Sequence, residues 1–159
     1  MNINIICIGK LKEKYWQAAV AEYTKRIGGY ARIQIVELKE SKLPKNASPA
    51  DESQVMEKEG ETILSKIGES DYVIAMEVEG KMLDSVELSR HLTKIFDSGR
   101  STVDFIIGGS LGLSPAVKKR ADFGLSFSRM TFPHQMARVL LLEQIYRSFK
   151  IANNETYHK

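Results

Sequence analysis

Short apolar runs alternate with segments of helical periodicity along the chain, and this alternation predicts the fold. The apolar runs occupy residues 3–8, 31–38, 71–76, 102–107 and 123–127. Their lengths are typical of strands in a covered sheet. Helical spacing of apolar residues, or a helix start signal, marks residues 12–27, 48–67, 84–96, 114–120 and 133–150. Strands that alternate with helices predict an α/β fold, with a mostly parallel sheet and helices on both faces.

Local signals set several boundaries of these elements. Ser48 is the expected N-cap of one helix, and Asp84 with Glu87 three residues later resembles a capping box at the start of another. Residues 39–50 are polar and contain two prolines, which predicts a loop. After the strand at 71–76, we expect a turn around Gly80.

Composition limits the class of protein without deciding its function. The 159 residues are 43% hydrophobic and 27% charged, as in an ordinary soluble domain, and we expect one domain over 1–159. No apolar run approaches the length of about 18–20 residues that spans a bilayer, and the N-terminus lacks the features of a signal peptide. The single cysteine, Cys7, lies in a strand pattern and is expected to be buried. A cytoplasmic protein without a membrane segment is therefore expected.

A glycine loop follows the strand at 102–107, at a position where α/β proteins bind ligands. Met76, Gly108 and Phe127 end three predicted strands, and ligands of open α/β sheets lie beyond such ends. Gly108 and Gly112 leave backbone exposed, so that a ligand can approach it. A tight strand-to-helix turn is the alternative reading, and the glycines alone do not decide between them. The net charge of +3 and the isoelectric point of about 8.9 permit an anionic partner such as RNA.

Known motifs exclude some classes of site and leave one open. The loop matches the GxSxG pattern of serine hydrolases, which would make Ser110 a nucleophile with His134 or His158 as base and Asp122 as acid. The chain is short for that fold, so a hydrolase is disfavoured. The GxGxxG and GxxxxGK[ST] patterns are absent. The histidines are isolated from one another and from the cysteine, so no metal site is expected.

The segment 126–132 and the helix after it form the most distinctive part of the chain. Hydroxyl groups and main-chain polar groups alternate there with apolar side chains, a combination that can hold an adenine. Pro133 is expected in the first turn of the last helix. The apolar face of that helix is broad for a terminal helix, which indicates a partner subunit. Packing within its own chain alone is the alternative.

At these residues the chain resembles a known family. The motif GGSLG, the run LSFSRMTFPHQMARVLLLEQIYRSFKI and the end NNETYHK are similar to the 23S ribosomal RNA pseudouridine N3-methyltransferases, of the SPOUT (α/β-knot) class. The likeness covers the whole length. It implies a C-terminal deep trefoil knot, with knot and cofactor site at about 102–151 and a tail at 152–159. It also implies a homodimer.

The resemblance further implies a cofactor, a substrate and catalytic residues. The cofactor is S-adenosylmethionine, and no metal is implied. By position, its ligands are Met76, Gly108, Phe127, Ser128, Arg129, Met130, Thr131 and Phe132. The substrate is a pseudouridine in the helix 69 stem-loop of 23S rRNA, within the assembled ribosome (70S or large subunit).

Tyr157 and His158 in the tail are the expected catalytic residues, because the imide N3 of pseudouridine must lose a proton before it attacks. We expect contacts to RNA from Lys10, Lys12, Arg129 and Arg138. A noncatalytic RNA- or ribosome-binding protein of the same fold is the rival hypothesis, beside the GxSxG hydrolase.

Overall fold

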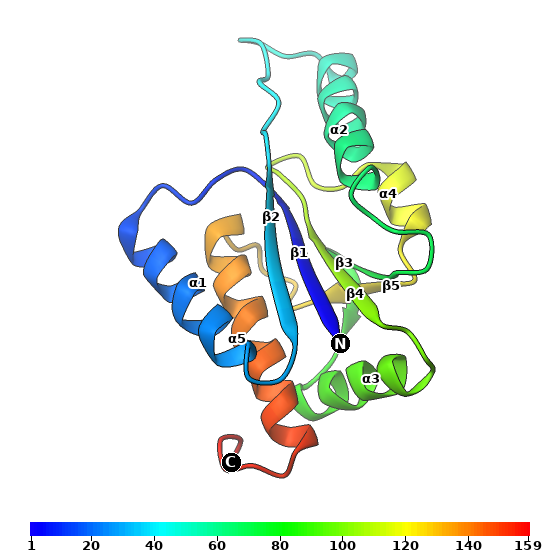
Figure 1. Cartoon of the computed structure of the whole chain (residues 1–159). Coiled ribbons are helices and arrows are strands. Elements are labelled where there is room, and N and C mark those ends of the chain that lie inside the picture. Colours follow the sequence, from blue (N-terminus) through cyan, green and yellow to red (C-terminus); the bar gives the residue numbers. More distant parts are fainter.

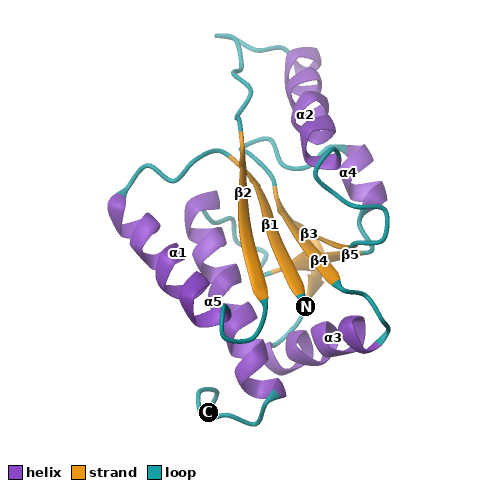
Figure 2. Cartoon of the chain, viewed as in Figure 1, coloured by secondary structure: helices purple, strands orange, loops and turns teal.

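The computed structural model describes residues 1–159, which form a five-stranded sheet between two layers of helices (Figures 1 and 2). The strands are β1 (Asn2–Ile8), β2 (Arg32–Leu38), β3 (Tyr72–Met82), β4 (Thr102–Ile107) and β5 (Phe123–Ser126). The helices are α1 (Lys14–Ile27), α2 (Pro49–Leu64), α3 (Ser85–Asp97), α4 (Pro115–Arg120) and α5 (His134–Ala152). The α/β class predicted from the hydrophobic pattern is confirmed. No helix is long and apolar enough to cross a membrane.

All strand pairs of the sheet are parallel, in the order β2-β1-β4-β3-β5. Residues of β1 alternate between its faces, as the strand period requires. Ile3, Ile5 and Cys7 pack with α1, α3 and α5, whereas Ile6 and Ile8 pack with α2 and α4. Both faces are therefore covered, as expected, and the five carboxyl ends meet at one edge of the sheet.

Helix starts follow the local signals in the sequence closely. The Ser48 side chain accepts a hydrogen bond from the Asp51 backbone, and the Asp51 carboxylate accepts one from the Ser48 backbone. Asp84 and Glu87 form the same reciprocal capping box, as predicted. The last helix differs by one residue, because extended Pro133 is its N-cap rather than part of its first turn.

Strand β3 is longer than its sequence pattern indicates. We expected it to end at Met76 with a turn around Gly80, but β3 continues to Met82 and resumes pairing with β5 after a register shift. Gly80 lies directly against the backbone of Gly124, where a Cβ atom on residue 80 would stand 2.8 Å from a carbonyl carbon. The glycine therefore permits close approach of two strands and makes no turn. This long-range contact leaves no local sequence signal.

Candidate functional site

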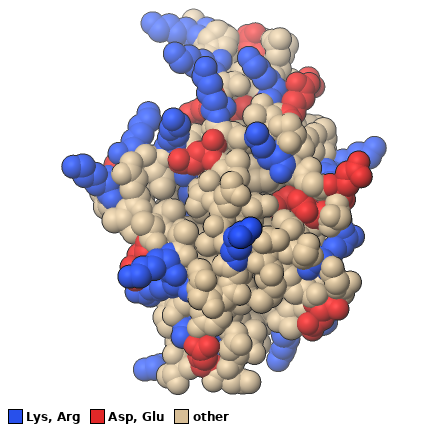
Figure 3. Space-filling model, viewed as in Figure 1, with Lys and Arg blue, Asp and Glu red and all other residues tan.

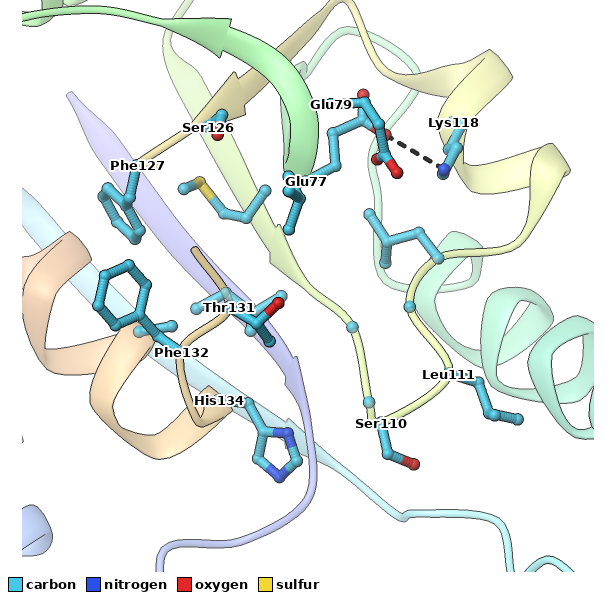
Figure 4. A pocket seen from close by; sticks show the side chains of 18 of the residues that line it. Glu77, Glu79, Ser110, Leu111, Lys118, Ser126, Phe127, Thr131, Phe132 and His134 are labelled. Carbon is cyan, nitrogen blue, oxygen red and sulfur yellow. Dashed lines mark ion pairs between the residues drawn. The ribbon is translucent and has the colours of Figure 1, made fainter. Parts of the chain in front are cut away.

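A cavity of about 1000 Å³ opens at the carboxyl ends of β3, β4 and β5 (Figure 4). Its walls come from α2, the shifted part of β3, the glycine loop after β4, the segment between β5 and α5, and the beginnings of α4 and α5. Of the eight residues expected to hold a cofactor, seven line it: Met76, Gly108, Phe127, Ser128, Met130, Thr131 and Phe132. Arg129 is exposed and does not line the cavity. One cavity thus collects side chains from three separate predicted strand ends.

The glycine loop is tight because the chain folds back on itself. A Cβ atom on Gly108 would lie 2.9 Å from the Gly112 carbonyl group, so Gly108 is required by its own loop before any ligand is considered. Gly112 has a φ of +82°, a conformation that residues with a side chain rarely adopt. The loop is therefore a tight turn, and its residues also line the cavity.

The segment 127–132 presents free main-chain groups beside an apolar wall. The Ser126 hydroxyl donates to the Ser128 carbonyl over 3.0 Å, and the Met130 N–H donates to the Ser128 hydroxyl over 3.1 Å. These two bonds fix the path of the segment. The N–H groups of Phe127, Thr131 and Phe132 donate to no other group of the chain. Such a wall suits a flat ring with polar edges, for which main-chain groups supply hydrogen bonds.

Charged side chains on another wall were not found from the sequence. Glu77 and Glu79 follow Met76 in β3, and Lys118 of α4 lies 3.4 Å from the Glu77 carboxylate (Figure 4). The figure shows these three opposite Phe127 and Phe132. The register shift of β3 places the two glutamates, so their spacing in the sequence gives no signal. Carboxylates at this position attract a positively charged group of a ligand.

The tail is folded against the middle of α5 and does not reach the cavity of its own chain. The Tyr157 hydroxyl donates to the Glu143 carboxylate over 3.1 Å, and Arg147 lies over the Tyr157 ring. Glu143 is nine residues after the cavity-lining His134, or roughly 14 Å along the helix axis. The expected catalytic tail and the expected cofactor residues are therefore separated within one chain.

The tail contacts also set the chemistry of its two candidate residues. Burial and the Glu143 carboxylate raise the pKa of Tyr157 to about 12 and keep its hydroxyl protonated near neutral pH. Arg147 Nη1 lies 3.3 Å from Nδ1 of His158. Because a guanidinium can only donate, Nδ1 is the acceptor in this contact. A frayed terminus would show no such contacts, so the tail is an ordered part of the molecule.

The serine hydrolase hypothesis fails on geometry. Ser110 and His134 both line the cavity, but no hydrogen bond joins them. Asp122 precedes β5 at the opposite edge of the sheet, where its carboxylate accepts from the Val73 N–H over 2.8 Å and pairs with Arg120. A triad needs its acid beside its base. The match to GxSxG therefore reflects only the tight turn after β4.

The prediction that Arg138 contacts RNA is wrong. Arg138 is only 1% exposed, because its guanidinium donates to the Glu37 carboxylate over 2.8 Å and to the Gly9 carbonyl over 3.3 Å. It fastens the ends of β1 and β2 to α5 and cannot reach a nucleic acid. Lys10 and Lys12 are exposed, as an RNA contact requires.

Comparisons with known proteins identify the family of the chain. The family described as Predicted SPOUT methyltransferase matches residues 1–158. A protein of Bacillus pumilus named ribosomal RNA large subunit methyltransferase H is 55% identical over 159 residues, which are all of both chains. One of Clostridium perfringens, named ribosomal RNA large subunit methyltransferase H 1, is 52% identical over the same span.

A solved structure supports the fold alone. The structure of a probable methylase family protein from Haemophilus influenzae aligns with a TM-score of 0.55 and 14% identity, and it covers 99% of this chain and 70% of the other. The full-length match to the family and the identity above 50% to the named relatives carry the assignment. The chain therefore belongs to the SPOUT methyltransferases, in the same family as the proteins named ribosomal RNA large subunit methyltransferase H.

Proposed function

We propose that this enzyme transfers a methyl group from S-adenosylmethionine to N3 of a pseudouridine in the helix 69 stem-loop of 23S rRNA. The substrate in this proposal is the assembled ribosome, so the enzyme acts in the cytoplasm. The names of relatives that match over the full length support ribosomal RNA of the large subunit as the substrate class. The resemblance of the C-terminal third of the sequence supports the nucleotide and the position.

The fit of the cavity to the cofactor is the observation that carries this proposal. Free N–H groups of the segment 127–132 beside apolar Met76 and Leu125 suit the adenine ring. Glu77 and Glu79 suit the positive charge of a sulfonium and an ammonium group. When bound, S-adenosylmethionine supplies an activated methyl group, so the protein contributes mainly position.

The proposal includes the deep trefoil knot at about 102–151. Strand β5 lies at the edge of the sheet beside β3, and α4 before it packs on the face opposite to α5 after it. The chain thus passes from one face to the other at this strand. A C-terminal helix that threads a loop of the chain requires such a passage, and in this proposal the segment 127–132 lies within the knot.

The catalytic groups in this proposal are Tyr157 and His158 of the tail. N3 of pseudouridine needs a group that takes up its proton or stabilises the resulting anion. Tyr157 is the weaker candidate for proton uptake, since its raised pKa of about 12 means that its hydroxyl already carries a proton. We assign it a hydrogen bond to the substrate and assign proton uptake to Nδ1 of His158, which has to leave Arg147 to accept the proton.

A homodimer would bring the tail to a cavity, because one chain alone keeps them apart. In this proposal the tail of one subunit completes the cavity of the other. Partly exposed apolar residues on α5, such as Leu140 at 36%, and Met130 at 73% beside the cavity support an interface there.

Cofactor binding can be tested at one wall of the cavity. Ala137 on α5 lines the cavity, and an Ala137→Leu variant fills it while keeping a residue of high helix propensity. We expect calorimetric titration with S-adenosylmethionine to show binding by the wild type and a loss of about tenfold or more in the variant. Ala152→Leu, on the exposed end of the same helix, is the matched control. A wild type that binds ribosomes but not S-adenosylmethionine would refute the proposal and support the rival hypothesis of a noncatalytic RNA-binding protein.

The role of the tail is tested with ribosomes as substrate. Deletion of residues 155–159 removes both candidate catalytic residues but none that lines the cavity. We expect methyl transfer from tritiated S-adenosylmethionine to hypomethylated 70S ribosomes to fall by about a hundredfold or more, with cofactor affinity unchanged. Unchanged turnover would show that the tail is not catalytic.

The shared site predicts rescue between two impaired variants, assayed at a concentration of S-adenosylmethionine too low for Ala137→Leu to bind it. Ala137→Leu has an intact tail, and His158→Ala has an intact cavity. If the tail acts in the partner, mixed dimers contain one complete site, and refolding an equal mixture should restore about a quarter of wild-type activity. A tail that serves its own chain leaves the mixture inactive.

A further inference from the structure

The segments that follow β1 and β2, the first of which includes the start of α1, carry a set of lysines that we call the basic rim. All six are exposed, and none forms an ion pair or a side-chain hydrogen bond within the chain. The basic rim consists of Lys10, Lys12 and Lys14 after β1, and Lys39, Lys42 and Lys45 after β2. Free ammonium groups on flexible stems are suited to contact phosphates.

The basic rim accounts for all of the net positive charge of the chain. Its segments, 9–14 and 39–48, contain six lysines and only two acidic residues, Glu13 and Glu40. The chain as a whole has a formal charge of +3, so the remaining residues are acidic on balance. The nearby Glu37 cannot neutralise the rim, because its carboxylate is paired with buried Arg138. The charge is thus gathered in two segments of the surface.

The position of the rim relates it to the cavity. Parallel strands end at one edge of the sheet, and β1 lies directly beside β4, which leads into the glycine loop. Neighbouring strands are about 4.8 Å apart, so β1 and β2 end about 5 and 10 Å from β4 across the sheet. In Figure 3, lysine and arginine side chains gather at the end of the molecule where Figure 1 shows the loop between β2 and α2. An RNA strand over the cavity would therefore meet these lysines within a few nucleotides.

We propose that the basic rim binds the sugar-phosphate backbone of the RNA that flanks the methylated nucleotide, with the loop 39–48 as its main arm. This inference rests on the proposed function and adds the surface that holds the substrate. Each phosphate that a lysine neutralises releases a condensed counterion, so the affinity depends steeply on salt concentration. Cofactor binding involves no residue of the rim, so it is independent of this surface.

The test replaces the arm without touching the cavity. In the variant Lys39→Ala/Lys42→Ala/Lys45→Ala, we expect KM for hypomethylated 70S ribosomes to rise about tenfold or more at 0.1 M salt. The kcat and the calorimetric Kd for S-adenosylmethionine should stay within about twofold of wild type. The slope of log KM against log salt concentration should fall by about two to three, near one for each lost phosphate contact. The thermal unfolding midpoint should not change, because all three side chains are exposed.

The control variant removes equal charge from elsewhere on the surface. Lys25, Lys66 and Lys94 are exposed, form no ion pair, and lie near the ends of α1, α2 and α3, at the opposite edge of the sheet. Their replacement by alanine should leave KM and the salt slope near wild type. An equal effect of both triple variants would mean that only net charge matters and would overturn the inference, as would an unchanged KM in the arm variant. If the wild type itself transfers no methyl group to ribosomes, the proposed function fails instead.

Discussion

The substitution Asp104→Asn should stabilise the protein near neutral pH, although it removes a buried hydrogen-bonded carboxylate. Asp104 of β4 is fully buried, and its Oδ1 accepts a hydrogen bond of 2.8 Å from the Asn4 side chain. Its Oδ2 has no donor, and the Asp71 carboxylate faces it. Burial, followed by the charge of Asp71, raises the pKa of Asp104 from 3.8 to about 6, against the hydrogen bond from Asn4 and the charge of Arg120, which lower it.

The magnitude follows from the linkage between the pKa and folding. A rise from 3.8 to about 6 makes ionised Asp104 about 3 kcal/mol less favourable in the folded than in the unfolded chain. Well below pH 3.8 the group is protonated in both states and costs nothing. The folded state loses stability as the pH rises from 3.8 to about 6, and the full cost is present above that range.

Asparagine keeps the acceptor for Asn4 and offers an N–H to Asp71. We therefore expect the free energy of unfolding at pH 7.5 to increase by about 1–3 kcal/mol. The gain should be near zero at pH 4. Urea unfolding of both proteins between pH 4 and 8 measures it, with the calorimetric Kd for S-adenosylmethionine as a check that the distant cavity is unchanged. A variant that is less stable at pH 7.5, or a difference that does not vary with pH, would refute this reasoning.

Three further predictions concern stability. Burial raises the pKa of Glu59, and its Oε2 has no hydrogen-bond partner. Glu59→Gln should therefore raise the free energy of unfolding at pH 8, and this gain should disappear as the pH falls. Urea titrations at pH 8 and at lower pH measure the difference. Gly80→Ala should cost about 1–3 kcal/mol and lower the unfolding temperature, because its Cβ meets the Gly124 backbone at 2.8 Å; an unchanged midpoint in calorimetry would contradict this contact. Glu37→Gln leaves buried Arg138 without its counter-charge and should cost about 3 kcal/mol in urea unfolding, whereas Glu40→Gln should have no effect.

The sequence predicted those parts of the fold that depend on neighbours along the chain. Ser48 and Asp84 start helices because their side chains bond the backbone three residues later. The run 3–8 forms a central strand because both faces of a parallel sheet are covered. The predicted length of β3 was wrong, because the role of Gly80 depends on contact with Gly124, which lies 44 residues away in β5.

The site shows the same division between local and distant causes. Seven of the eight residues that the resemblance implied for the cofactor line one cavity, because they lie at or after the ends of strands, which meet at one edge of a parallel sheet. Arg138 was expected to contact RNA as a basic residue near the mouth of the pocket, but Glu37 and the Gly9 carbonyl hold its charge inside the molecule. Lys118 was missed because α4 brings it to Glu77 across the sheet edge. Contacts between distant elements account for each of these errors.

Helix α5 lines the cavity near its beginning and contacts the tail at its middle. The number of residues between these two points therefore fixes the distance and the angle between the cavity and the tail. One residue inserted between Ala137 and Glu143 would rotate the tail by about 100° and shift it by about 1.5 Å relative to the cavity wall. In a symmetric dimer that error would occur at both sites. We therefore expect insertions and deletions among related enzymes to gather in the loop 39–48 and to be absent from this stretch of α5. Sequence length would then vary in the proposed RNA-binding loop and stay constant in the part of α5 that separates the cavity from the tail.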